Sequence, residues 1–242
     1  MIDHSLLHPT MTDEQLVEGC QIALDYDVAA VCIKPYFVKE TAEILKGSNV
    51  AVCSVIGFPH GNSTTELKVL ETKKACEEGA TEIDMVANAG KVLGEDWDYV
   101  SQEIQAINSE CLKHGTILKV IFENDFLTED RFKIKLCEIC TEVGVAFIKT
   151  STGYGFVKGT DGKYSYQGAT EHDLKLMKKH AGPEVKIKAA GGVRTLDGLI
   201  KVMDLGCSRL GASATVSILE EAKKRLGMTP GKATDLAANS GY

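Results

Sequence analysis

Lys149 ends an apolar run and is followed at once by small hydroxyl residues and glycine, in the order AFIKTSTG over residues 146–153. A lysine buried beside other cations loses part of its proton affinity, because desolvation and like charge both disfavour the ammonium form. The free amine can then attack a carbonyl group and form a Schiff base. Taken alone, the segment is equally compatible with a structural lysine that reaches solvent or a bound anion.

A second lysine pattern occupies residues 185–194, which read VKIKAAGGVR. Period-two alternation places Lys186 and Lys188 on one face of a strand. In a parallel barrel, the inward face of this strand ends at Lys188 and opens into Gly191 and Gly192, whose backbone could approach an anion closely. We therefore expect two strand-end lysines to converge.

Composition limits the class of protein. The chain has 242 residues, of which 44% are hydrophobic, enough for one globular domain over residues 1–242 with a flexible tail at 229–242. Its start lacks the basic and apolar stretches of a signal peptide, and no apolar run is long enough to span a membrane, so we expect a cytoplasmic protein without a membrane partner. The formal net charge of -7 argues against a nucleic-acid binder.

Cysteine and histidine residues give no redox or metal motif. The eight cysteines are typical of reduced core thiols in a chain of this length. Cys137 and Cys140 form a C-x-x-C pair, but it falls inside a helical pattern rather than at a strand-to-helix turn, which favours core packing. His4 and His8 lie near Asp3 without a third ligand at a metal-binding spacing, so no metal is predicted.

Short β-branched runs alternate with longer amphipathic stretches, which is typical of repeated βα units and a parallel sheet. The expected strands span residues 2–6, 29–33, 51–56, 82–86, 117–122, 146–149, 186–189 and 209–211. The expected helix starts follow Thr12, Thr64, Thr128, Thr170 and Thr195. Eight such units predict an α/β fold, a single (β/α)8 TIM barrel, with a doubly wound open sheet as the alternative. The chain has no G-x-G-x-x-G or Walker A sequence, which disfavours nucleotide-binding folds.

In a TIM barrel, active sites gather at the carboxyl ends of the strands. The polar residues that we expect there are Asp3, Asp84, Glu123, Lys149 and Lys188. An aspartate inside an apolar strand is costly unless it is paired, so Asp84 should be an ion-pair partner for a lysine or a proton-transfer group.

Two segments lead from an expected strand into a helix, GGVRT at residues 191–195 and GASAT at residues 211–215. Exposed backbone N–H groups and the positive end of a helix attract an anion at such places. In TIM barrels the segments after the last two strands commonly bind phosphate. The predicted phosphate contacts are Gly191, Gly192, Arg194, Gly211 and Ser213.

Five ordered segments, at residues 3–7, 52–61, 82–86, 146–153 and 188–194, closely resemble the deoxyribose-phosphate aldolase family, across nearly the whole chain. The resemblance implies a class I aldolase that reversibly cleaves 2-deoxy-D-ribose 5-phosphate to acetaldehyde and D-glyceraldehyde 3-phosphate, in deoxyribonucleoside catabolism. It implies neither a metal nor an organic cofactor.

The resemblance also implies a role for each central residue. Lys149 matches the Schiff-base nucleophile, and Lys188 matches the second lysine, whose charge lowers the proton affinity of the nucleophile. Asp84 matches the acid/base that works through a bound water. Supporting contacts to the substrate are expected from Asp3, Glu123, Thr150 and Gly153.

The chain departs from the family pattern at three places. Lys34 stands where the family commonly has asparagine. Residues 154–167 contain an insertion of about ten residues, which should form an exposed loop or lid. Ala214 removes one hydroxyl donor from the phosphate segment, and Lys158 or Lys163 of the inserted loop could compensate for it.

Other functions stay open at this point. One is another Schiff-base or phosphate-handling barrel enzyme, such as a transaldolase-like or ketose-phosphate aldolase, and another is a barrel that binds a phosphorylated metabolite without turnover. Two lysines and an aspartate that face one another argue against the last. The expected partner is a small phosphorylated sugar, and a homodimer is left open. Tyr242 resembles a mobile terminal tyrosine of some family members, although a disordered terminus is favoured.

Overall fold

The computed structural model describes residues 1–229. Its barrel strands are β1 (Ile2–Leu6), β2 (Ala30–Ile33), β3 (Ala51–Ile56), β4 (Glu82–Val86), β5 (Ile117–Ile121), β6 (Phe147–Lys149), β9 (Lys186–Ala190) and β10 (Arg209–Ala212). They close in the order β1, β10, β9, β6, β5, β4, β3, β2, and every neighbouring pair is parallel. The predicted TIM barrel is confirmed, and each predicted strand end lies within one residue of the observed one.

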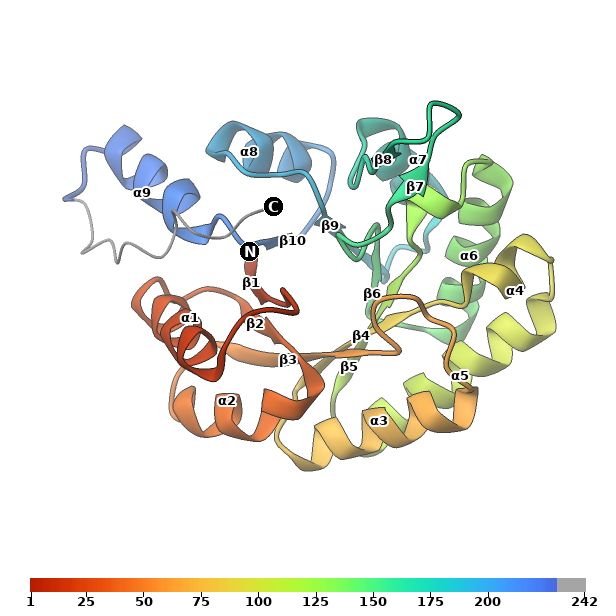
Figure 1. The fold of residues 1–242 in the computed structure, drawn as a ribbon, viewed down its shortest axis with the longest axis horizontal. Helices are drawn as coiled ribbons and strands as arrows, with labels where there is room; N and C mark the ends of the chain where they lie inside the picture. Colours follow the sequence, from red (N-terminus) through yellow and green to blue (C-terminus); the bar gives the residue numbers. More distant parts are fainter. Residues whose placement is uncertain (230–242) are drawn as a thin grey trace.

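Helices surround the strands (Figure 1). They are α1 (Asp13–Asp25), α2 (Val38–Ile44), α3 (Thr65–Glu77), α4 (Ala89–Leu93), α5 (Trp97–Lys113), α6 (Asp130–Val143), α7 (Glu171–His180), α8 (Leu196–Asp204) and α9 (Thr215–Arg225), with the 3-10 turns η1 (Pro35–Phe37) and η2 (Asn124–Phe126). None of the helices in residues 1–229 combines the length and the apolar run that crossing a bilayer requires.

Threonine caps start four of the helices where the sequence predicts them. The side chain of Thr12 accepts from the backbone of Gln15, whose own side chain accepts from the backbone of Thr12, a capping box that pairs two otherwise free N–H groups. Single side-chain caps at the other three starts come from Thr64, Thr170 and Thr195. The start predicted after Thr128 is also observed, since α6 begins at Asp130, but the cap position is Glu129, which makes no side-chain cap hydrogen bond.

The main hydrophobic core lies between the strands and the helices. In β4, Ile83 and Met85 belong to this core, whereas Glu82 and Asp84 are buried without being part of it. Successive side chains of a strand point to opposite faces, so the alternate residues face the barrel interior. Period-two alternation thus separates an apolar outer face from a charged inner one.

The insertion at residues 154–167 forms a small antiparallel hairpin of β7 (Val157–Lys158) and β8 (Tyr164–Ser165). Both strands are exposed, and the hairpin extends away from the barrel beside α7 (Figure 1). The expected exposed loop is therefore present and has strand structure of its own. Residues 230–242, which hold most of the predicted tail and Tyr242, lie outside the described residues.

Candidate active site

Charged side chains gather in the interior of the barrel. They are the carboxylates Asp3, Glu82 and Asp84 and the cations Lys119, Lys149, Lys188 and Arg209. All except Arg209 are buried, so their mutual attraction is little screened by solvent. We call these seven side chains the interior cluster.

Asp84 is the centre of this cluster. Its Oδ2 lies 2.8 Å from Lys149 Nζ and 2.7 Å from Lys188 Nζ, and its Oδ1 lies 2.7 Å from Lys119 Nζ. Burial alone would raise the pKa of Asp84, but the three ammonium groups outweigh burial and hold that pKa well below its usual value. Asp84 is therefore an ionised carboxylate that bridges three lysines.

Strand register explains why these groups meet. Asp84 and Lys119 are partners on β4 and β5, and Lys149 and Lys188 are partners on β6 and β9. In each strand the residue occupies an inward-facing position, and closure of the barrel brings the two pairs together. The predicted convergence of Lys149 and Lys188 is confirmed, although Lys188 is the middle residue of β9 and not its last.

Asp3 is the second carboxylate, besides Asp84, that forms an ion pair with Lys188. Its Oδ2 lies 2.5 Å from Lys188 Nζ, and its Oδ1 accepts from Arg209 Nη1 over 2.5 Å. Burial would lower the pKa of Lys188, but Asp3 and Asp84 outweigh burial and raise it, so Lys188 keeps its charge. Asp3 is the second residue of β1 rather than a strand-end group, and it does not line the cavity described below. In the structure Asp3 contacts Lys188, and its expected contact with the substrate stays a prediction.

Lys119 is a site residue to which the sequence reasoning gave no role. Its ammonium group contacts Asp84, Glu82 Oε2 at 2.7 Å and Cys53 Sγ at 3.1 Å. Burial opposes its charge, but the neighbouring acids raise the pKa of Lys119 well above its usual value. The signal was present in the sequence, because Lys119 interrupts the apolar run of β5 at an inward position.

Two thiols lie beside Asp84 and could be mistaken for metal ligands. One ligand atom each of Cys32, Cys53 and Asp84 lie within 4.8 Å of one another. The ammonium group of Lys119 already contacts both Cys53 and Asp84, so a cation of the protein itself neutralises this group. These residues fit an ammonium ion better than a bound metal.

A cavity opens at the carboxyl ends of the strands. Its lining includes Lys149, the predicted substrate contact Gly153, and the predicted phosphate contacts Gly191, Gly192, Arg194, Gly211 and Ser213. Gly191 and Gly192 have φ angles of +86° and +82°, which favour glycine because a Cβ would be strained there. Backbone turns of this kind can direct N–H groups at an anion. We call this space the mouth cavity.

Thr150 and Glu123, two predicted substrate contacts, hold the backbone beside Lys149 and do not line the mouth cavity. The hydroxyl of Thr150 donates to Ala190 O over 3.0 Å and accepts from Ala190 N over 3.1 Å. Glu123 accepts from the backbone N–H and the hydroxyl of Thr152, and burial raises the pKa of Glu123 to about 7. Both residues fix the turn that follows β6, and their expected contact with the substrate stays a prediction.

Lys34 does not add a free cation to the mouth. Its ammonium group donates to the carbonyl oxygens of His8 and Met11 over 3.3 and 3.0 Å. It therefore holds the loop between β1 and α1, and burial lowers the pKa of Lys34.

The inserted hairpin contributes aromatic side chains to the mouth cavity. Tyr154 and Tyr166, at its two ends, both line the cavity. Lys158 and Lys163 are exposed and are not part of the lining, so the idea that they replace a phosphate contact finds no geometric support. Tyr154 packs edge-on against Phe58, with 5.5 Å between the ring centres.

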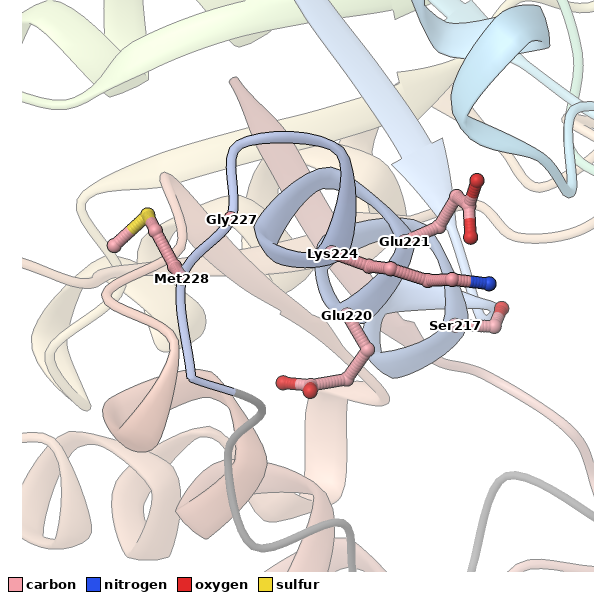
Figure 2. A pocket seen from close by; sticks show the side chains of 6 residues that line it. All are labelled: Ser217, Glu220, Glu221, Lys224, Gly227 and Met228. Atoms are coloured by element: carbon pink, nitrogen blue, oxygen red, sulfur yellow. The ribbon is translucent and has the colours of Figure 1, made fainter.

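A second hollow lies on the outer side of α9 (Figure 2). Its walls come from Ser217, Glu220, Glu221, Lys224, Gly227 and Met228. They contain no residue of a barrel strand and no member of the interior cluster. Reactive groups and a cavity therefore coincide at the mouth and not at α9.

Comparisons with known proteins agree with this geometry. A family model described as DeoC/LacD family aldolase matches residues 1–233. The chain is 48% identical over 242 residues to the deoxyribose-phosphate aldolase of Rhodopirellula baltica, covering 100% of this chain and 95% of the relative. It is 45% identical to that of Treponema denticola, covering 90% and 96%. The solved tetrameric deoxyribose phosphate aldolase of Aeropyrum pernix is 28% identical with a TM-score of 0.81, covering 93% and 90%.

Proposed function

Because the chain belongs to the DeoC/LacD family of aldolases, we propose that it is a class I aldolase that reversibly cleaves 2-deoxy-D-ribose 5-phosphate to acetaldehyde and D-glyceraldehyde 3-phosphate. One observation carries the proposal. Among the seven charged residues of the interior cluster, Lys149 alone lines the mouth cavity, and its amine contacts Asp84 directly. A carbonyl compound that enters the cavity would meet this amine first.

The interior cluster holds four basic side chains and three carboxylates. The three carboxylates are balanced by Lys119, Lys188 and Arg209, so a proton on Lys149 would leave one positive charge in excess. Excess charge of one sign is unfavourable in a buried site. Schiff-base formation requires that Lys149 release this proton and act as the neutral amine nucleophile.

In the proposed reaction, Lys149 Nζ bonds to C1 of the open-chain sugar, and the carbonyl oxygen leaves as water. The protonated imine accepts the electron pair of the C2–C3 bond as that bond breaks, while the hydroxyl proton on C3 passes to a base. Glyceraldehyde 3-phosphate departs and leaves an enamine on Lys149. Protonation at C2 and hydrolysis of the imine then release acetaldehyde and restore the amine.

Asp84 and Lys188 are suited to move the protons of this sequence. Asp84 Oδ2 accepts from both Lys149 and Lys188, so one carboxylate oxygen connects the reacting nitrogen with a permanent proton donor. We assign Asp84 the transfer of protons to and from the substrate through a water molecule, and Lys188 the supply of charge and protons to Asp84.

The distal end of the substrate would lie on the glycine turns. Gly191 and Gly192 follow β9, and Gly211 to Ser213 belong to the end of β10 and the loop before α9. Backbone N–H groups at these positions and the positive end of α9 suit a phosphate group. A phosphorylated sugar would thus extend from Lys149 toward the last two strands of the barrel.

Reductive trapping tests the proposal. The protein is incubated with acetaldehyde and borohydride, and the expected result is an ethyl group on Lys149, located by peptide mass spectrometry. Lys149→Ala should abolish both the adduct and the cleavage of 2-deoxyribose 5-phosphate. Lys186→Ala is the matched control, because Lys186 lies on the same strand as Lys188 but is exposed at its other end.

The trapping experiment also separates the other readings of the site. An adduct that forms only with a three-carbon ketone would replace this proposal with a ketose-phosphate or transaldolase-like activity. No adduct with any carbonyl compound would contradict Schiff-base chemistry at Lys149 altogether and favour a binding protein.

A further inference from the structure

The chain that leaves the inserted hairpin, at Gly168, packs its backbone against the glycine turn at Gly191. A Cβ on Gly168 would lie 2.7 Å from the carbonyl carbon and oxygen of Gly191, and a Cβ on Gly191 would lie 3.0 Å from Gly168 Cα. Ala169 N also donates to Gly191 O over 3.2 Å. The hairpin and the proposed phosphate turn are therefore coupled, because neither backbone can move far without the other.

Asp125 also holds the chain in place at Gly168, through two hydrogen bonds to its backbone. Its Oδ1 accepts from Gln167 N over 2.5 Å, and its Oδ2 accepts from Gly168 N over 3.0 Å. Hydrogen bonds from two consecutive N–H groups to one carboxylate define the direction of the chain there. The residue that precedes them, Tyr166, is thereby held at a defined place although most of the hairpin is exposed.

Tyr166 points toward the mouth cavity rather than into solvent. It lines the cavity, and its ring carbon Cε2 lies 3.2 Å from the place that a Cβ of Gly191 would take. Phe156, which lies just before the first strand of the hairpin, packs edge-on against the Tyr166 ring with 5.2 Å between ring centres. By contrast, Tyr164 of the same hairpin is 65% exposed.

The phenol group of Tyr166 is available to a ligand. Within residues 1–229 its hydroxyl forms no hydrogen bond, whereas the hydroxyls of Tyr26 and Tyr36 each donate to a carboxylate. A tyrosine hydroxyl in a partly buried place normally finds a partner. In the mouth cavity, a ligand group bound at Gly191 and Gly192 would supply the hydrogen-bond partner that the Tyr166 hydroxyl lacks.

We propose that Tyr166 determines specificity for the phosphorylated end of the substrate, by donating a hydrogen bond from its hydroxyl to the phosphate that lies on Gly191 and Gly192. The proposal rests on the proposed aldolase function and adds a contact that the barrel strands do not provide. The insertion thus supplies part of the binding site, and Asp125 and Gly168 are the residues that hold it in place.

Tyr166→Phe tests this contact, since it removes one oxygen and leaves the ring packing intact. We expect KM for 2-deoxyribose 5-phosphate to rise about tenfold, the loss typical of one hydrogen bond to a charged group, with kcat unchanged. Cleavage of unphosphorylated 2-deoxyribose should not change. Inorganic phosphate, used as a competitive inhibitor, should bind about tenfold more weakly to the variant.

Tyr164→Phe is the matched control, because it removes the hydroxyl of the exposed tyrosine on the same hairpin. Equal effects of Tyr166→Phe on both sugars, or no effect on either, would overturn the inference. Acetaldehyde trapping on Lys149 is measured in the same samples. An intact adduct with no loss of phosphate discrimination refutes only the role of Tyr166, whereas an absent adduct in the unmodified protein refutes the aldolase function itself.

Discussion

Lys149 and Lys188 donate to the same oxygen, Oδ2 of Asp84, over 2.8 and 2.7 Å. The two lysines are also register partners on β6 and β9, so their spacing is set by strand pairing rather than by flexible side chains. A shared acceptor lets a proton pass from one nitrogen to the other through a single carboxylate.

Replacing Lys188 by Leu should slow the reaction and move its pH dependence. The variant removes one cation, so a proton on Lys149 is then needed to balance the three carboxylates. We expect kcat/KM to fall by about 10²-fold or more, and the acid limb of the pH–rate profile to move to higher pH. Lys188→Arg keeps the charge and should leave that limb in place. Coincident limbs for the Leu variant and the unmodified enzyme would contradict the electrostatic role.

Replacing Asp84 by Asn should destabilise the fold as well as stop turnover. The amide leaves the ammonium groups around it without their shared carboxylate, and breaking a buried ion pair in this way costs about 3–5 kcal/mol. Urea denaturation at pH 7 measures the loss. Asp161→Asn, on the exposed turn of the hairpin, is the control and should change stability little.

The pH dependence of the Asp84 effect has a defined sign. Because the pKa of Asp84 is depressed in the folded protein, its contribution to stability is present above the unfolded pKa of about 3.9 and is lost as the pH falls through the folded pKa. The stability difference between Asp84→Asn and the unmodified protein should therefore be largest at neutral pH and shrink below pH of about 4. A difference that stays constant into acid would show that Asp84 does not carry the charge.

Much of the fold could be predicted from the sequence because local patterns decide it. β-branched runs marked the eight barrel strands to within one residue, and Thr12 with Gln15 identified a helix start. The start of α6 after Thr128 was also found, but the capping residue is Glu129, because a threonine near a helix start need not be the cap. The hairpin inside residues 154–167 was also not predictable, since its two-residue strands depend on pairing with each other.

The site residues also divide into those that the sequence predicts and those that it does not. Lys149 could be found because a lysine at the end of an apolar strand is unusual, and the glycine turns could be found because they follow strands. The depth of Asp3, the role of Lys119 and the clamp between Thr150 and Ala190 could not be predicted. The partners of Asp3, Lys119 and Thr150 depend on which side chains meet across the closed barrel, and one-dimensional spacing does not contain that information, although the inward position of Lys119 can be read from the apolar run of β5.

Replacing Glu123 by Gln should change how stability depends on pH. The pKa of Glu123 is raised to about 7 in the folded protein, so its contribution is fully present below the unfolded pKa of about 4.3 and is lost as the pH rises toward 7. The Gln variant cannot ionise and should gain stability relative to the unmodified protein between pH 5 and pH 8, by about 3 kcal/mol at most. Urea denaturation at the two pH values measures this gain, with exposed Glu184→Gln as the control. Parallel pH profiles would contradict the raised pKa.

Gly191→Ala and Gly47→Ala form a pair that separates backbone strain from crowding. Both glycines have a left-handed φ, +86° and +82°, but only a Cβ at Gly191 meets neighbours, at Gly168 Cα and Tyr166 Cε2. A Cβ at Gly47 has nothing within 4 Å. Each variant should lose about 1–2 kcal/mol of folding stability through its left-handed backbone, measured by urea denaturation.

Only Gly191→Ala should also damage catalysis, because the added methyl group pushes apart the phosphate turn and the inserted hairpin. We expect kcat/KM for 2-deoxyribose 5-phosphate to fall on the order of 10²-fold, as a displacement of about 1 Å at a binding site can cause. Unphosphorylated 2-deoxyribose should be affected much less, since it does not use the turn. If Gly191→Ala lost stability but cleaved both sugars as well as Gly47→Ala does, the glycine turn could not be the place where the phosphate is held.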